Sequence, residues 1–107
     1  MSDTDLFGVL RTACGDPAIS SLTMRQLAML IACDRMDWLV HVLAEHLGVS
    51  VSVISRGADA LVRAELMRRW SQPSDKRRVW LGLTPAGKTA VERVSKARLE
   101  MERTTHG

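Results

Sequence analysis

The sequence predicts one mainly α-helical domain of 107 residues with a small β-hairpin. Apolar residues recur at helical spacing through most of the chain, and the period changes to strand-like alternation only after Leu66. Thr84-Pro85 then begins a last helix, because threonine is a good N-cap and proline suits the first helical position. The expected order is therefore four helices, a hairpin and a further helix.

The composition is that of a soluble globular protein, with 46% apolar and 25% charged residues. No apolar run approaches the roughly 18 residues that a membrane span needs. The first five residues carry two acids and no base, unlike a signal peptide, so we expect a cytoplasmic protein. Cys14 and Cys33 are too few for a disulfide framework, and both are expected to be buried and reduced.

The first two helices are predicted from apolar faces and from their ends. Residues 4–14 form a helix that Gly15 can terminate. The second helix begins at Thr23, which forms a capping box with Gln26, and fades near Asp34. Its expected buried stripe is Leu27, Leu30 and Ile31.

Residues 38–47 and 51–64 are predicted to form a helix-turn-helix. Such a motif needs a small residue where the helices cross, a turn residue that tolerates the left-handed conformation, and a branched apolar residue that anchors the second helix. Ala44, Gly48 and Ile54 occupy these places. The same spacing is compatible with an ordinary helical hairpin that has a glycine turn.

The second helix of this motif has two distinct faces. Ile54, Ala58 and Leu61 point inward, and a polar face lies opposite. Small hydroxyl groups and an arginine near a helix N-terminus suit a DNA major groove, where arginine can contact guanine through two hydrogen bonds. Ser50 is expected to cap this helix. The candidate DNA-binding residues here are Ser50, Val51, Ser52, Ser55, Arg56, Asp59 and Arg63.

The hairpin is predicted from residues 67–70 and 79–83, joined by residues 71–78, with Trp70 and Trp80 facing each other. From residue 56 to residue 78 the chain has seven bases and three acids, a net charge of +4, and the remainder is −1. A concentrated positive charge indicates a polyanionic partner such as nucleic acid. A solvated surface is the alternative that charge alone leaves open.

The stretch from Asp75 to Gly87 reads Asp-Lys-Arg-Arg-Val-Trp-Leu-Gly-Leu-Thr-Pro-Ala-Gly. It resembles the MarR family of bacterial regulators, whose wing has Asp-x-Arg, a strand and then Leu-Thr-x-x-Gly. Residues 43–50, Ser55-Arg56 and the Leu22-Thr23 pair with Gln26-Leu27 are also similar to the family. The resemblance covers roughly residues 20–90.

The resemblance implies a winged helix-turn-helix, with the helix-turn-helix at about 39–64, the wing at about 66–83 and terminal helices at 4–14 and 85–103. It implies a sequence-specific regulator of transcription, most simply a repressor, that binds double-stranded DNA. The second helix of the motif enters the major groove. Arg77 enters the minor groove, whose negative potential attracts it, and Asp75 orients Arg77. The candidate DNA-binding residues in the wing are Asp75, Lys76, Arg77 and Arg78.

The resemblance also implies a homodimer built from both chain ends. Ala90, Val94, Ala97 and Met101 repeat as a seam against another helix would. Packing of the first helix on the last within one chain is the alternative. Family members usually continue with another long helix and have a glycine near Glu65. Peroxide-sensing relatives support an N-terminal cysteine with tyrosines, which this chain lacks.

Two other functions remain compatible with the sequence: a winged-helix module that binds protein, and a cysteine redox switch on the same fold. An enzyme is not expected, because no nucleophile–base pair, phosphate loop or paired carboxylates are found. His41, His46 and His106 lack partners at metal-ligand spacing, so neither a metal nor another cofactor is expected. The sequence does not identify a small-molecule effector.

Overall fold

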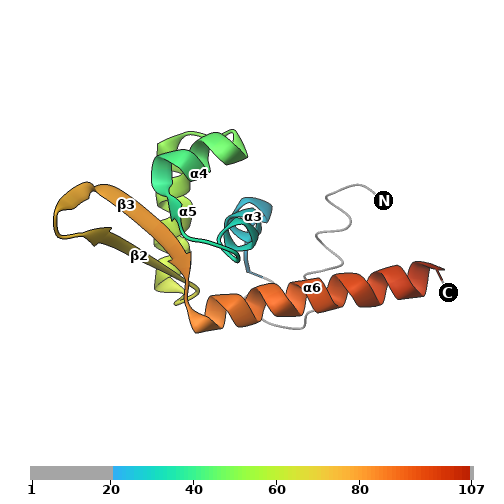
Figure 1. The fold of residues 1–107 in the computed structure, drawn as a ribbon. Coiled ribbons are helices and arrows are strands. Elements are labelled where there is room, and N and C mark those ends of the chain that lie inside the picture. The colour runs from blue at the N-terminus through green and yellow to red at the C-terminus, as the bar shows by residue number, and fades with distance from the viewer. Residues whose placement is uncertain (1–20, 107) are drawn as a thin grey trace.

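The computed structural model describes residues 21–106 of the chain. The predicted helix at 4–14, and Cys14 with it, lie outside the described residues. Four helices and a three-stranded antiparallel sheet, ordered β1-β3-β2, make up the described part (Figure 1). No helix among these residues is long and apolar enough to cross a membrane. The elements are α3 (Met24–Ala32), β1 (Trp38–Leu39), α4 (Val40–Leu47), α5 (Val51–Arg63), β2 (Met67–Gln72), β3 (Asp75–Leu83) and α6 (Pro85–His106).

Helix α3 begins with the predicted capping box. The backbone N–H of Gln26 donates to Oγ1 of Thr23 at 3.1 Å, and the backbone N–H of Thr23 donates to Oε1 of Gln26 at 2.9 Å. The prediction that Ile31 is buried is wrong, because its side chain is 50% exposed. The helix packs against both α5 and α6, so its buried arc runs from Leu27 through Leu30 to Met29 and leaves Ile31 beyond one edge.

The helix-turn-helix geometry is confirmed at its three diagnostic positions. Ala44 and Ile54 are buried, and Gly48 ends α4 in the left-handed conformation with a φ of 70°. Ser50 caps α5, since its side chain accepts the backbone N–H of Val53 at 3.3 Å. Helix α5 ends at Arg63, one residue before the predicted end.

The start of α4 differs from the prediction. Residues Trp38 and Leu39 form strand β1 instead of the first turn of the helix. They pair with Leu81 and Trp80 of β3, whose free edge offers backbone hydrogen bonds that a helix start would leave unused. The indole of Trp38 donates to the carbonyl oxygen of Ala32 at 2.8 Å. The expected hairpin is therefore part of a three-stranded sheet.

The wing strands β2 and β3 are longer than predicted. The connection between them is only Pro73-Ser74, so residues 75–78, expected in the loop, belong to β3. Trp70 and Trp80 are cross-strand partners, as predicted. Their rings stack with centroids 5.4 Å apart and an interplanar angle of 11°.

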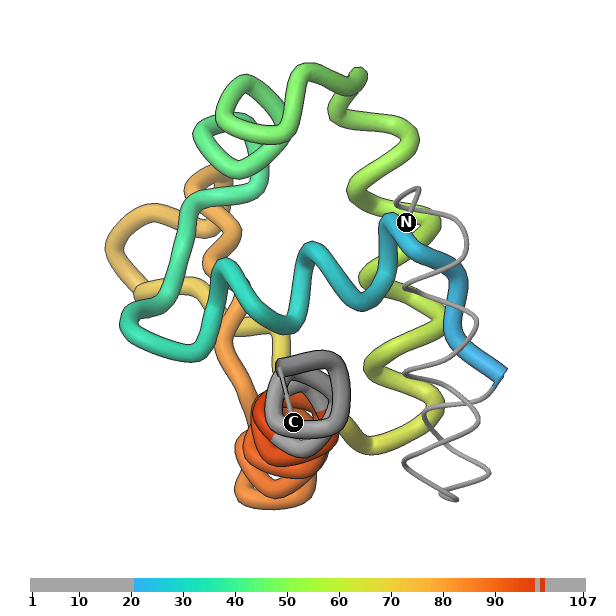
Figure 2. Tube along the Cα trace, turned by 90° about the vertical axis from the view of Figure 1, so that its right-hand side faces the viewer, coloured from blue at the N-terminus to red at the C-terminus, as the bar shows by residue number. Residues whose placement is uncertain are grey.

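Helix α6 continues to His106, three residues beyond the predicted end, and runs away from the wing (Figure 1). It lies beneath α3 when the molecule is viewed along its axis (Figure 2). Ala90, Val94 and Ala97 are buried in the same core as the helix-turn-helix and the sheet. The expectation that this seam needs a second chain as its partner is therefore wrong for these three residues. The side chain of Met101 lies outside the described residues.

The base of the wing is a crowded junction. Glu65, between α5 and β2, has a φ of 61°, the left-handed conformation that glycine adopts more easily. This is the place where the sequence lacks the expected glycine, and the turn keeps the glycine conformation. Its carbonyl oxygen accepts the Thr84 hydroxyl at 2.7 Å. A Cβ atom on Gly87 would lie 2.0 Å from the carbonyl oxygen of Leu66, so only glycine fits there.

Replacement of Glu65 by glycine is expected to stabilise the fold. A non-glycine residue in the left-handed conformation costs about 1 kcal/mol or more, which exceeds the entropy cost of glycine, so the gain should be about 0.5–1 kcal/mol. Urea unfolding of Glu65→Gly measures it, and Glu65→Ala is the control, because alanine keeps the strained φ. An alanine variant as stable as the glycine variant would contradict the role of φ.

Candidate nucleic-acid interface

The outward face of α5 carries most of the predicted contact residues. Its inward face is buried as predicted, through Ile54, Ala58 and Leu61. A strongly amphipathic helix of this kind presents its polar face to solvent. On that face Ser55 is half-buried, and the exposed residues are Val51, Ser52, Arg56, Asp59 and Arg63, with the capping Ser50 at the helix start.

Arg56 lies on the side of α5 that faces α3. Its Nε donates to the carbonyl oxygen of Ser52 at 3.4 Å, so the side chain lies back along its own helix. A hollow of about 340 Å³ separates it from the first turn of α3, and Arg25 lines the same hollow. Two arginines from different helices therefore flank this side of α5. Sequence reasoning missed Arg25, and its place in the first turn of a capped helix was the available signal.

Strand alternation assigns the wing residues to two faces. Arg77 and Val79 of β3 face α5, whereas Arg78 and Trp80 line a hollow on the opposite face. Lys76 is exposed near the tip. Oδ1 of Asp75 accepts the backbone N–H of Arg77 at 3.2 Å. Asp75 thus contacts the backbone of Arg77, which stabilises the turn. The guanidinium group of Arg77 is not used in this contact.

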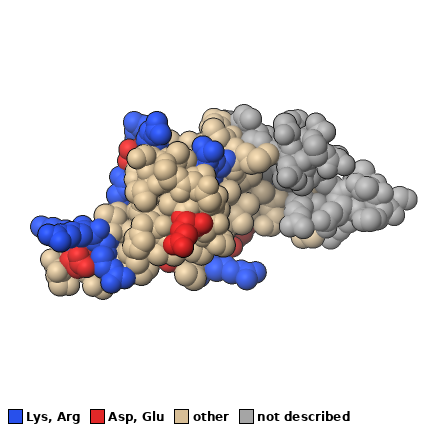
Figure 3. All heavy atoms as spheres, turned by 90° about the horizontal axis from the view of Figure 1, so that it is seen from above, with Lys and Arg blue, Asp and Glu red and all other residues tan. Residues whose placement is uncertain are grey.

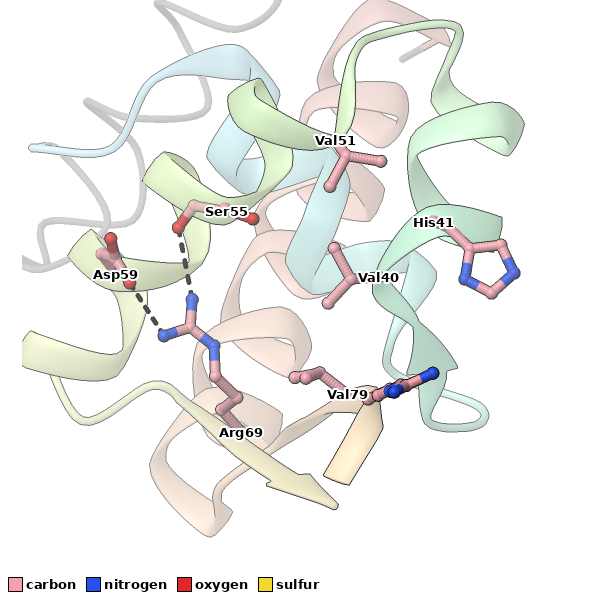
Figure 4. A pocket seen from close by; sticks show the side chains of 8 residues that line it. Val40, His41, Val51, Ser55, Asp59, Arg69 and Val79 are labelled. Atoms are coloured by element: carbon pink, nitrogen blue, oxygen red, sulfur yellow. Dashed lines mark hydrogen bonds and ion pairs between the residues drawn. The ribbon is translucent and has the colours of Figure 1, made fainter. Parts of the chain in front are cut away.

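A hollow of about 440 Å³ lies between the outward face of α5 and the wing (Figure 4). Arg69 of β2 extends across it toward α5. Its Nη1 lies 2.8 Å from Oδ1 of Asp59, and its Nη2 donates to the carbonyl oxygen of Ser55 at 3.3 Å. The lining residues are Val40, His41, Val51, Ser55, Asp59, Arg69, Arg77 and Val79.

The wing is held on its other face by Asp37, which sequence reasoning also missed. Oδ2 of Asp37 accepts the indole N–H of Trp70 at 2.7 Å and lies 3.1 Å from Nη2 of Arg68. A Cβ on Gly82 would lie 2.3 Å from Oδ1 of Asp37, so this carboxylate sits where a side chain would otherwise be. These two contacts join residues that are 31 and 33 positions apart in the sequence, so no local sequence pattern predicts them.

Basic side chains gather at the end of the molecule where the wing lies, together with an acidic one (Figure 3). Further bases lie along the margins of the face that this figure shows. The positive charge that the sequence concentrates between residues 56 and 78 is thus carried by α5 and the wing.

The sequence profile of the MarR family matches residues 22–79, which is more than half of the chain. The chain belongs to the MarR family. Its fold is accordingly a winged helix-turn-helix, and the protein is a DNA-binding transcription regulator. The family is one of regulators and not of enzymes. No curated protein sequence matches the chain.

Solved structures similar to this MarR-family chain share its fold over most of its length. RV1404 from Mycobacterium tuberculosis is 27% identical, with a TM-score of 0.79 over 96% of this chain and 71% of that one. YusO from Bacillus subtilis is 22% identical, with a TM-score of 0.80 over 95% and 71%. A mutant MarR from E. coli complexed with operator DNA is 22% identical, with a TM-score of 0.72 over 89% and 66%.

Cys33 is a core residue with a 3% exposed surface. Burial, and secondarily the charge of Asp37, raise the pKa of its thiol from 9.0 to about 12. A reactive cysteine is a thiolate, so this residue is poorly suited to a redox role. No group of three or more histidine, cysteine or acidic residues among residues 21–106 could hold a metal ion. His46 instead packs on Trp38, with ring centroids 4.8 Å apart.

Cys33 is expected to resist thiol reagents while the protein is folded. In a Cys14→Ser variant, which removes the other thiol, Ellman's reagent should react with Cys33 only after urea is added.

The unfolded thiol ionises at lower pH than the folded one, so the stability that Cys33 contributes should be complete below about pH 9 and decline as pH rises toward 12. Rapid labelling of the folded variant would contradict this assignment.

Proposed function

We propose that this protein binds double-stranded DNA sequence-specifically as a homodimeric repressor. Helix α5 enters the major groove and reads bases, and the wing reaches the adjacent minor groove. By occupying a promoter in the cytoplasmic nucleoid, the dimer blocks access to the DNA. The proposed contacts are ten of the eleven residues predicted from the sequence, from Ser50 in the cap of α5 to Arg78 in the wing; Asp59 is the residue left out.

One observation carries this proposal: the exposed polar face of α5 and the Arg77 side of the wing flank the same hollow. A major groove about 12 Å wide accepts a helix, and its neighbouring minor groove attracts arginine when it is narrow. The small side chains Ser52 and Ser55 permit close approach of the α5 backbone. The mutant MarR of E. coli, which shares this fold, is complexed with operator DNA.

The homodimer is proposed through the terminal helices. Because Ala90, Val94 and Ala97 are occupied within the chain, a partner has to use the remaining surface of α6. Leu99, which is 55% exposed, is an apolar residue on that surface. A two-fold dimer would place two copies of α5 about one DNA turn apart and thus read a near-palindrome.

Arg56 and Arg77 are expected to support DNA binding by different routes. Arg56→Ala should cost about 1–3 kcal/mol and relax specificity at one base pair, because it removes a base contact. Arg77→Ala should weaken binding most at AT-rich flanks, where the minor groove is narrow. Affinity titrations on selected duplexes measure both effects, with Lys88→Ala on α6 as the charge-matched control.

The same titrations at several salt concentrations test the proposed function itself. Neutralised phosphates release counterions, so log affinity should fall with log salt by a slope of several units. Arginine variants that bind like the wild type would refute the assigned face and wing. A flat salt response of the wild-type protein would favour a winged-helix module that binds protein.

Leu99→Glu is expected to weaken the dimer, because it places a charge at the proposed apolar contact. Light scattering at micromolar concentration should then give a lower mass than for the wild type. Val94→Glu is unsuitable for this purpose, since Val94 is buried within the chain. Lys88→Glu, at the start of the same helix, is the control. A monomeric wild type, or a dimer indifferent to glutamate at position 99, would argue against this interface.

A further inference from the structure

Among the residues that the structure describes, Arg69 joins the wing to α5 through an ion pair. Its guanidinium group contacts Asp59 through Nη1 and the Ser55 carbonyl through Nη2, so it spans one turn of α5 (Figure 4). Residues four apart lie on the same face of a helix, and the planar fork of arginine can bond to both at once. Lysine offers no such fork.

This ion pair is too exposed to contribute much to the free energy of unfolding. The side chains of Arg69 and Asp59 are 36% and 53% exposed, and exposed pairs are weak stabilisers. Its effect is therefore mainly geometric. The 440 Å³ hollow beside it shows that side-chain packing does not fill the space between α5 and the wing. Arg69 spans this unfilled space from the wing side.

The elements that Arg69 joins are those that carry the proposed DNA contacts. Arg56 lies on α5, and Arg77 lies on β3, which pairs with the strand of Arg69. A shift of the wing relative to α5 would change the distance between the side chains that enter neighbouring grooves. Displacements of this kind weaken recognition even when every contact residue is present.

We propose that Arg69 is a positioning residue for DNA recognition, which sets the spacing between recognition helix and wing through Asp59. The proposal rests on the proposed function and refines it. Asp59, expected from the sequence to contact DNA, then acts through Arg69 instead of through a base. Its carboxylate charge is offset by the guanidinium group 2.8 Å away, which limits the repulsion between this acid and DNA phosphates.

The sign of the effect of Asp59→Ala separates positioning from simple electrostatics. Removal of an acid from a DNA-facing surface should strengthen binding if charge alone matters. If Asp59 holds Arg69, the same change should weaken binding by about tenfold, as expected when one coupled pair is lost. Arg69→Ala should weaken binding similarly, and the double variant should be no worse than either single variant.

Four readouts distinguish a positioning role from a loss of stability or of a phosphate contact. Hydroxyl-radical footprints of both single variants should lose the minor-groove protection by the wing while methylation protection in the major groove persists. The salt slope of Asp59→Ala should equal that of the wild type. The exchanged pair Asp59→Arg with Arg69→Asp should recover part of the affinity, and thermal unfolding should show that each variant is folded at the assay temperature. Glu45→Gln and Lys88→Ala serve as charge-matched controls.

Asp59→Ala that binds as tightly as the wild type, or more tightly, would overturn the proposal. It would also be overturned if only Arg69→Ala weakened binding and its salt slope fell by about one, the signature of a direct phosphate contact. Failure of the wild-type protein to bind duplex DNA in a salt-dependent manner would instead refute the proposed function, so the two failures are distinguishable.

Discussion

The direction of the wing and of α6 depends on the close approach of backbone at one junction. The Leu66 carbonyl oxygen accepts the backbone N–H of Thr84 at 3.2 Å and occupies the space that a Cβ of Gly87 would need. The Thr84 hydroxyl donates to the carbonyl of Glu65 and accepts the backbone N–H of Gly87 at 3.0 Å. The start of β2, the end of β3 and the first turn of α6 are thereby held together. The Leu-Thr-x-x-Gly pattern is thus a structural requirement and carries no DNA contact in our proposal.

From this junction, strand alternation divides the wing between two tasks. Arg69 and Arg77 extend on the side of α5, where the proposed DNA contacts lie. Arg68 and Trp70 extend on the other side, where the Asp37 carboxylate accepts a hydrogen bond from each of them. A two-stranded ribbon by itself is marginally stable, so a wing needs attachment to the body of the protein. Here polar side chains of strand β2 contribute to that attachment on both faces of the wing.

The features that the sequence predicted correctly are those with local causes. The capping box of α3, the turn at Gly48 and the pairing of Trp70 with Trp80 each follow from residues close in the chain or from strand register. Strand β1 was missed because a two-residue strand has no period of its own and exists only through its pairing with β3. Ile31 was misplaced because the buried arc of α3 depends on which helices pack around it. Asp37 and Arg69 were missed because their partners are distant in sequence.

The contacts of the acidic residues also bear on how a chain with a formal charge of only +3 could present the proposed DNA-binding surface. Of the three acids between residues 56 and 78, Asp59 is paired with Arg69, and Asp75 accepts a backbone N–H. Both are engaged by donors of the chain, while Arg56, Arg63 and Lys76 remain exposed. The segment from residue 56 to residue 78, which includes most of α5 and the wing strands, has a net charge of +4, so the positive charge is concentrated there. Sequence reasoning counts these charges correctly but cannot pair them, because the pairing is a property of the fold.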